Sequence, residues 1–288
     1  MIWQLINFLF RFSGRIYFSN EQKSWATALQ SSKSYNDKNI FDKIIKLYDL
    51  IKNKDKEFYE RDSLIFHQKP DETELINFLN QTIKNTKKPL EILDYGGSLG
   101  SRYYSNYNFI VNKNINWNII EQQDFVQYGK KKLQNKRLNF YYDLNDCFKD
   151  KKVNFTLFSN SLQYLENYTQ ILKEIKDQNV KYFFFDYLPL SFYKNHKIFI
   201  QNISKRVYES SYPIHIFSKN SFIKDIKNLN FKVCKLKKKS TVFYGFNYYS
   251  LALENLDFKK RFIFFLSSFV IFVFSMPFAI SMGEFGLI

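Results

Sequence analysis

A short apolar run that breaks into glycines constrains this chain more than any other stretch. Residues 91–101 read Glu-Ile-Leu-Asp-Tyr-Gly-Gly-Ser-Leu-Gly-Ser. An apolar run that meets small residues is typical of a buried parallel strand followed by a tight turn. Glycine reaches positive φ without steric cost and lets a ligand approach the backbone. The free N–H groups of a following helix would face the same space. The stretch therefore predicts a strand, a ligand-binding turn and a helix, in that order.

The spacing of the glycines separates two kinds of nucleotide-binding turn. The dinucleotide pattern has glycines at its first, third and sixth positions, but here the sixth position is Ser101. This difference disfavours a nicotinamide dehydrogenase. The stretch fits better with an acid two residues before the first glycine, followed by small residues at alternate positions: Asp94, Gly96, Ser98 and Gly100. This order resembles the first motif of class I S-adenosylmethionine-dependent methyltransferases.

Strands and helices alternate after this turn. Further strands are predicted at residues 115–121, 138–142, 153–158 and 181–185, and a closing hairpin at 231–236 and 248–253. Helical stripes lie between them, and four of the strands end in polar residues, which indicates one binding edge at their carboxyl ends. The sequence predicts an α/β, Rossmann-like methyltransferase fold with a mostly parallel seven-stranded sheet and a closing antiparallel strand.

Three further parts are predicted around or within this domain, which we expect at residues 71–255. Residues 1–70 are expected to form an N-terminal helical extension, and residues 190–217 a less regular insertion. The apolar tail, residues 259–288, begins with three basic residues, and no charged residue follows over 262–283. As a helix that segment would measure ~33 Å, enough to cross a bilayer core of ~30 Å, with the domain on the cytoplasmic side. We expect a membrane anchor, with a buried core helix as the alternative.

Glu121 is the acid most readily assigned by spacing. It ends the predicted second strand, 21 residues after Gly100. An acidic residue at about this separation meets the ribose hydroxyls in nucleotide-binding α/β folds. A carboxylate suits that task because both of its oxygens accept hydrogen bonds. The sequence therefore predicts that Glu121 binds the ribose of a nucleotide-like cofactor.

A broader set of segments resembles a bacterial family of methyltransferases found among genes for cell-surface polysaccharide assembly. Outside the glycine turn, the matching segments are residues 12–14, 24–25, 60–63, 161–165, 201, 208 and 211–213. The resemblance covers roughly residues 12–254 and leaves out the tail. It implies S-adenosyl-L-methionine as the cofactor and O-methylation of a sugar or a lipid-linked glycan precursor.

The resemblance also implies roles for particular residues. The cofactor would be bound by the turn, by acids at strand ends and by the end of the fourth strand: Asp94, Gly96, Gly97, Ser98, Gly100, Glu121, Asp143, Ser159 and Asn160. The substrate would contact Ser161, Gln163, Tyr164 and Tyr212. A sulfonium methyl group is already activated, so positioning of the acceptor is the main task, and a base is needed only if an alcohol loses its proton. The candidate catalytic residues are His215 and Tyr187.

Two other functions are open at this point. The 43 Lys and Arg residues outnumber the 27 Asp and Glu residues, which gives a net charge of +16 and favours anionic partners such as nucleic acid. A nucleic-acid methyltransferase is therefore one alternative, but Ser-Asn-Ser-Leu at 159–162 replaces the Asn/Asp-Pro-Pro-aromatic motif of many amino-methylating enzymes. The other is a non-enzymatic cofactor-binding or assembly factor at the membrane. Cys147 and Cys234 are too few for a disulfide framework and lack metal-ligand spacing, so we expect a cytoplasmic location and no metal site.

Overall fold

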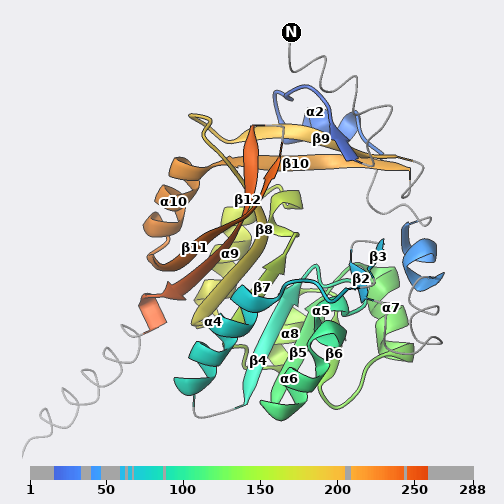
Figure 1. Ribbon diagram of the computed structural model, residues 1–288, viewed down its shortest axis with the longest axis vertical. Helices are drawn as coiled ribbons and strands as arrows, with labels where there is room; N and C mark the ends of the chain where they lie inside the picture. Colours follow the sequence, from blue (N-terminus) through green and yellow to red (C-terminus); the bar gives the residue numbers. More distant parts are fainter. Residues whose placement is uncertain are drawn as a thin grey trace, which may run out of the picture.

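A computed structural model shows the arrangement of most of the chain (Figure 1). It describes residues 16–33, 40–46, 59–61, 64–66, 68–86, 89–204, 209–242 and 245–258. These residues form one ten-stranded sheet, a separate two-stranded hairpin, and helices on both faces of the large sheet. The predicted anchor at 262–283 lies outside the described residues. Among the residues described, every helix is too short or too polar to reach across a bilayer.

Five parallel strands form the centre of the large sheet. They are β4 (Leu90–Tyr95), β5 (Ile115–Ile120), β6 (Leu138–Tyr141), β7 (Phe155–Ser159) and β8 (Tyr182–Ser191), in the spatial order β6-β5-β4-β7-β8. The strand β12 (Phe246–Asn255) pairs antiparallel with β8, and β11 (Phe231–Val242) pairs antiparallel with β12. The predicted, mostly parallel α/β sheet with a closing antiparallel strand is therefore confirmed. The strands β5 and β6 lie on one side of β4, and the later strands β7 and β8 lie on the other side. The topological switch point, where ligands bind in such sheets, therefore lies beside β4.

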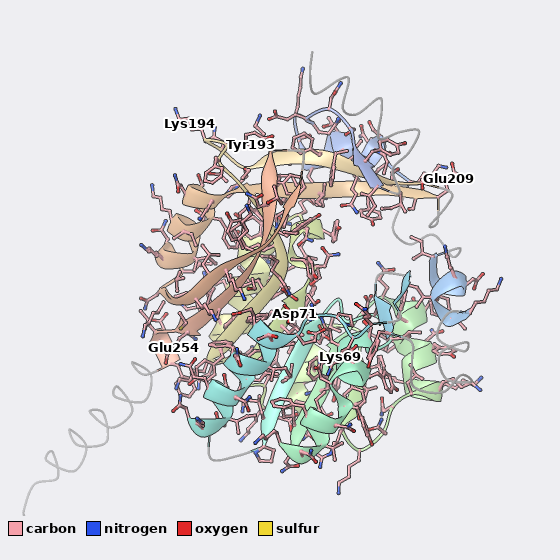
Figure 2. All side chains as sticks on the ribbon, in the orientation of Figure 1. Lys69, Asp71, Tyr193, Lys194, Glu209 and Glu254 are labelled. Atoms are coloured by element: carbon pink, nitrogen blue, oxygen red, sulfur yellow. The ribbon has the colours of Figure 1, made fainter. Side chains whose placement is uncertain are left out.

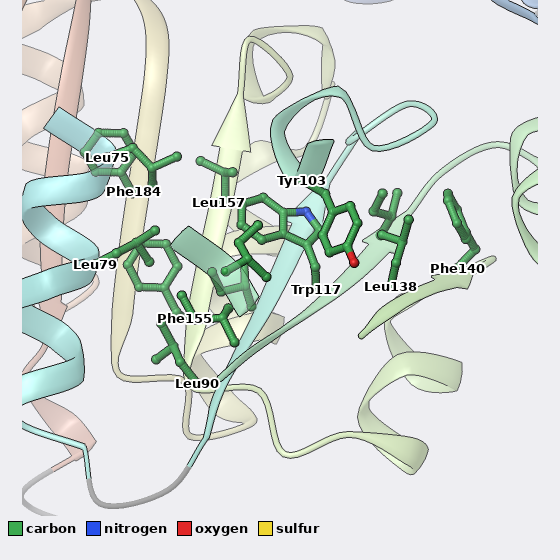
Figure 3. Close-up of a cluster of buried hydrophobic side chains, with 14 of the residues drawn as sticks. Leu75, Leu79, Leu90, Tyr103, Trp117, Leu138, Phe140, Phe155, Leu157 and Phe184 are labelled. Atoms are coloured by element: carbon green, nitrogen blue, oxygen red, sulfur yellow. The ribbon is translucent and has the colours of Figure 1, made fainter. Parts of the chain in front are cut away.

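Helices cover both faces of this sheet because its central strands are apolar on both sides. The helices are α4 (Thr73–Lys84), α5 (Ser101–Ser105), α6 (Tyr107–Asn112), α7 (Gln123–Lys132), α8 (Leu144–Asp150), α9 (Tyr168–Asp177) and α10 (Lys219–Asn228). Leu75 and Leu79 of α4 pack with Trp117 and Phe155 in one core (Figure 3). The helices α8, α9 and α10 contribute to a second core, which also contains Leu93. Each face of the sheet therefore has its own hydrophobic core.

Three additional strands extend the sheet beyond the predicted seven. The outer end of β8 pairs with β10 (Ser210–Ser218), which pairs with β9 (Lys197–Ile203), and β9 pairs with β1 (Ile16–Phe18). Figure 1 shows β9 and β10 together at the top of the molecule, with α2 (Trp25–Gln30) beside them. The prediction of an irregular insertion at 190–217 is therefore wrong. Every residue of β10 is buried, so its sequence lacks the polar–apolar alternation that reveals a half-exposed strand.

The N-terminal region is not purely helical either. Besides α2 and a helical segment at 40–46, it contains β1 and the hairpin of β2 (Tyr59–Arg61) and β3 (Leu64–Phe66). The strand β1 joins the large sheet through β9. Residues 16–18 are therefore part of the same sheet as the glycine turn, although more than 70 residues separate them from it in the sequence.

Candidate active site

The register of the parallel strands brings their carboxyl ends to one edge. Tyr95 pairs with Ile120, and Ile120 pairs with Tyr141. On the other side of β4, Ser159 at the end of β7 pairs with Asp186 in β8. The residues that follow β4, β5, β6 and β7 therefore lie along a single edge, as the sequence predicts. Most of the candidate cofactor-binding residues are on these segments.

The turn after β4 has a backbone that suits glycine. Gly96 and Gly100 have φ angles of 75° and 91°, and Ser98 between them has a φ of 53°. A Cβ atom on Gly96 would lie 2.8 Å from the Cβ of Ser161, and one on Gly97 would lie 2.6 Å from Oδ2 of Asp94. Both distances are too short for real Cβ contacts. The turn is therefore closely packed from below by Asp94 and from one side by Ser161, and a side chain at either glycine would displace it.

Asp94 is a fully buried acid beneath this turn. Its Oδ2 atom accepts a hydrogen bond of 2.9 Å from Nε1 of Trp117, and its Oδ1 atom has no hydrogen-bond partner among the described residues. Burial raises the pKa of Asp94 to about 7, against the opposing effects of the Trp117 hydrogen bond and the positive charge of Arg102. Buried acceptors are rarely left unpaired in proteins. The free oxygen is therefore a position at which a donor from a bound molecule would be stabilised.

Glu121 is attached directly to the glycine turn. Its Oε1 atom accepts a hydrogen bond of 3.2 Å from the backbone N–H of Ser98, and its Oε2 atom accepts one of 2.8 Å from the N–H of Gln122. Burial raises the pKa of Glu121, and these two backbone hydrogen bonds oppose that rise. Each carboxylate oxygen has a second lone pair for a further donor. The structure thus places the turn and the acid together, as the sequence predicts.

The end of β7 forms the opposite wall of the turn. Oγ of Ser161 donates a hydrogen bond of 2.6 Å to the backbone oxygen of Tyr95. Asn160 has a φ of 56°, and its Oδ1 atom accepts a hydrogen bond of 2.6 Å from Nε2 of Gln163, which is buried. Oγ of Ser159 accepts a hydrogen bond of 2.9 Å from Nε of Arg102. The contact between Ser161 and Tyr95 holds the segment after β7 against the end of β4.

Asp143 lies at the same edge but performs a local task in this structure. It is exposed, and its Oδ1 atom accepts a hydrogen bond of 2.9 Å from the backbone N–H of Asp146. This contact caps the N-terminus of α8, as an aspartate commonly does. The role of Asp143 as a cofactor-binding residue stays a prediction.

Tyr164 and Tyr212, two of the candidate substrate-binding residues, are in contact although 48 positions separate them. Their rings meet edge to face at 5.1 Å. The hydroxyl of Tyr164 donates a hydrogen bond of 3.1 Å to Oε1 of Gln201, and Nε2 of Gln201 lies 3.4 Å from the hydroxyl of Tyr212. Tyr164 belongs to the short helix η1 (Leu162–Tyr164), which directly follows Ser161. The pair therefore connects the glycine turn to the strands β9 and β10.

The two candidate catalytic residues have different surroundings. The ring of His215 stacks on Trp25 at 4.5 Å and on Phe217 at 5.5 Å, and burial lowers the pKa of His215 to about 4. His215 and Tyr212 are three residues apart on β10, so they point to opposite faces of the sheet. Tyr187 directly follows Asp186, and Nζ of Lys239 lies 4.6 Å from the centre of its ring. Tyr187 therefore lies next to Asp186, which pairs with Ser159 at the end of β7. His215 lies on β10, outside the five central parallel strands.

A cluster of buried charges at this edge escapes the sequence predictions. Arg102, the second residue of α5, forms ion pairs with Glu72 and Asp186 and is 3% exposed. Nζ of Lys239 lies 2.9 Å from Oδ1 of Asp186. Burial opposes the charge on Asp186, but the positive charges of Arg102 and Lys239 outweigh it and lower the pKa of Asp186. We call these four residues the Arg102 cluster. The one hint of it in the sequence is Asp186, a charged residue that directly follows the apolar run predicted as a strand at 181–185.

The segment before α4 supplies part of this cluster. In Figure 2, Lys69 and Asp71 mark its course across the edge of the sheet at which β4 ends. Glu72 follows and is 5% exposed. The Arg102 cluster therefore includes a residue that precedes the glycine turn by about 25 positions.

The residues at this edge fit an S-adenosyl cofactor in three respects. The glycines leave the backbone of the turn open to close approach. Asp94 and Glu121 provide acceptors for an amino group and for ribose hydroxyls. The acids Asp94 and Glu121 add negative charge to the nearly balanced Arg102 cluster, which favours a cationic sulfonium.

The strand order β6-β5-β4-β7-β8-β12-β11, with the glycine turn after β4, defines a Rossmann-like α/β fold of the class I methyltransferase type. No protein-family model matches the sequence, and no curated protein matches it.

Several solved structures of methyltransferases are similar to this chain. An S-adenosylmethionine-dependent methyltransferase from Methanosarcina mazei is 14% identical, with 61% of this chain and 97% of that chain covered and a TM-score of 0.44. One from Clostridium acetobutylicum is 12% identical, with coverages of 75% and 99% and a TM-score of 0.46. The 1,6-didemethyltoxoflavin N1-methyltransferase of Burkholderia thailandensis, solved with S-adenosylhomocysteine, is 10% identical, with coverages of 83% and 94% and a TM-score of 0.47. At such identities and TM-scores, similarity does not identify the reaction of this chain.

Proposed function

We propose that this protein binds S-adenosylmethionine at the turn after β4 and transfers its methyl group to a small acceptor. The observation that carries the proposal is the joint placement of Asp94, the glycines and Glu121 at the topological switch point. A turn without side chains, above a buried acid with a free acceptor atom, allows close approach to the backbone and provides polar partners for the cofactor.

Each residue of the site has a stated task in this proposal. The bound cofactor supplies a methyl group activated by the sulfonium. Glu121 accepts hydrogen bonds from the ribose hydroxyls with the lone pairs that Ser98 and Gln122 leave unused. Oδ1 of Asp94 accepts from the amino group of the methionine part, and Asp143 accepts from the adenine amino group. Ser159 and Asn160 lie on the side from which the acceptor approaches.

We further propose a sugar or a lipid-linked glycan precursor as the acceptor. Tyr164 and Tyr212 offer aromatic faces with hydroxyl groups, and Gln201 and Gln163 offer both donors and acceptors. These groups match the apolar faces and hydroxyls of a sugar. Transfer to a sugar hydroxyl requires removal of a proton, and for this step we propose Tyr187, because His215 and Tyr212 point to opposite faces of β10. An anchor at 262–283 would hold the domain close to a lipid-linked substrate.

Calorimetric titration of S-adenosylmethionine and S-adenosylhomocysteine into the full-length protein tests this proposal. We expect saturable binding in the micromolar range. Glu121→Ala should weaken it by roughly tenfold or more, since hydrogen bonds to a charged acceptor are worth about 1.5–3 kcal/mol each.

Glu254→Ala is the matched control, because Glu254 pairs with Lys181 near the opposite ends of the strands, where Figure 2 labels it. Its affinity should equal that of the wild type. Thermal unfolding of each variant verifies that it is folded. Absence of heat with the folded wild-type protein, or equal affinity in Glu121→Ala, would contradict the proposed site.

A further inference from the structure

The Arg102 side chain connects four parts of the chain that are distant in sequence. Its Nε atom donates to Ser159 at the end of β7, and its two terminal nitrogens bind Glu72 before α4 and Asp186 in β8. Arg102 itself lies two residues after Gly100, the last glycine of the turn. All three directions of the guanidinium are used, which a lysine could not reproduce. The start of α5 is thereby fixed to the end of β7 and to the middle of β8.

Arg102 is also one of the charges that act on Asp94. The groups facing Asp94 come from three parts of the chain: Trp117 and Glu121 from β5 and the residue after it, Arg102 from α5, and Glu72 from the segment before α4. Arg102 favours the charged form of Asp94, whereas Glu72 and Glu121 disfavour it. The two members of one ion pair therefore have opposite effects on the same buried acid.

We propose that Arg102 is a positioning residue of the site: it fixes the start of α5, directly after the glycine turn, to the end of β7 and to Asp186 within β8. Its positive charge also favours the ionised form of Asp94 beneath the turn. A charged Asp94 is the form that attracts the cationic amino group of the cofactor. That purpose rests on the proposed function, whereas the effect of Arg102 on Asp94 does not.

The indole group of Trp117 offers a direct reporter of Asp94. Its Nε1–H donates to Asp94 at 2.9 Å, and the ring is fully buried. The chain has three tryptophans, so a nitrogen–proton correlation spectrum of the indole groups holds three signals. The variant Trp117→Phe assigns the signal by removing it. Protonation of Asp94 weakens the acceptor and moves the Trp117 signal, so its pH midpoint measures the titration of Asp94.

The expected shifts of the pH midpoint, relative to the wild type, have opposite signs in variants of the two partners of this ion pair. In the wild type we expect a midpoint near pH 7, where burial places the pKa of Asp94. Arg102→Met should raise the midpoint by about one pH unit, and Glu72→Gln should lower it by a similar amount, since one nearby charge moves a pKa by about 1–3 units. Arg102→Lys keeps the charge and should stay closer to the wild type than Arg102→Met. Arg137→Met and Glu254→Gln, which alter charges outside the cluster, should leave the midpoint unchanged.

The direction of these changes separates positioning from general stabilisation. Loss of structure alone would move the midpoint in the same direction in Arg102→Met and Glu72→Gln. The proposal would be overturned if the midpoint moved in the same direction in both variants or did not move in either. It would also be overturned if the Trp117 signal of the wild type did not titrate near neutral pH. If Arg102→Met does not fold, Glu72→Gln and Arg102→Lys still give different expectations: a lowered midpoint in the first and a nearly unchanged midpoint in the second.

The same variants link the titration to ligand binding. The affinity for S-adenosylmethionine should rise with pH through the midpoint that the indole signal gives for each variant. If no variant binds S-adenosylmethionine but the indole midpoints move in opposite directions, the proposed function fails while the role of Arg102 stands. If binding occurs but its pH dependence is identical in all variants, the role of Arg102 fails instead.

Discussion

Arg102→Met is expected to lower the free energy of unfolding by about 3–5 kcal/mol, the usual cost of removing one partner from a buried ion pair. The side chain is 4% exposed, and its removal deprives the buried acids Glu72 and Asp186 of their arginine partner. Urea denaturation followed by circular dichroism measures the change. Domains usually have about 5–15 kcal/mol of stability, so enough folded protein should be left for study.

Two further variants control this result. Arg137→Met removes an arginine that donates to Asn114 near the surface, and it should change stability by less than about 1 kcal/mol. Adding Glu72→Gln to Arg102→Met removes one of the two acids that lost their arginine partner, so the double variant should be more stable than the sum of the single changes predicts. A loss below about 1 kcal/mol in Arg102→Met would show that the cluster is not the buried network described above.

Gly96→Ala is expected to destabilise the protein by about 2–4 kcal/mol and to weaken binding of S-adenosylmethionine by roughly tenfold or more. The φ angle of 75° disfavours any residue with a Cβ atom, and that atom would lie 2.8 Å from Ser161. The turn must move to relieve the overlap, and the proposed cofactor site moves with it. Calorimetric titration together with urea denaturation measures both effects.

Gly129→Ala is the matched control for Gly96→Ala. Its Cβ atom would lie 2.5 Å from the ring of Phe140, but Gly129 belongs to α7 and has an ordinary helical backbone. Overpacking should destabilise this variant without changing its affinity for the cofactor. If both alanine variants lose affinity equally, binding depends on overall stability and not on the shape of the turn.

The central part of the fold could be predicted because its signals are local. An apolar strand that ends in Asp94 and glycines, followed at the usual distance by Glu121, specifies both the elements and their common edge. The register of parallel strands then brings the ends together without further information. Asp143 shows the limit of such reasoning, since the same position serves as a helix cap in the structure.

The rest depends on contacts between distant residues, which a single sequence does not reveal. Arg102 is 30 residues from Glu72 and 84 from Asp186, and no local pattern marks them as partners. The strands β9 and β10 were hidden for a related reason. Gln201 of β9 and every residue of β10 are buried, polar ones included, so neither strand shows a regular alternation of polar and apolar residues. Both the Arg102 cluster and the strands β9 and β10 therefore depend on tertiary contacts that bury polar residues.

A crystal structure of the full-length protein with S-adenosylhomocysteine tests the central claim most directly. The account predicts that the ribose hydroxyls lie within hydrogen-bonding distance of Glu121 and that the amino group of the ligand contacts Oδ1 of Asp94. The sulfur should face Ser159 and Asn160. A ligand bound elsewhere, with the turn at Gly96 unchanged and empty, would contradict the account.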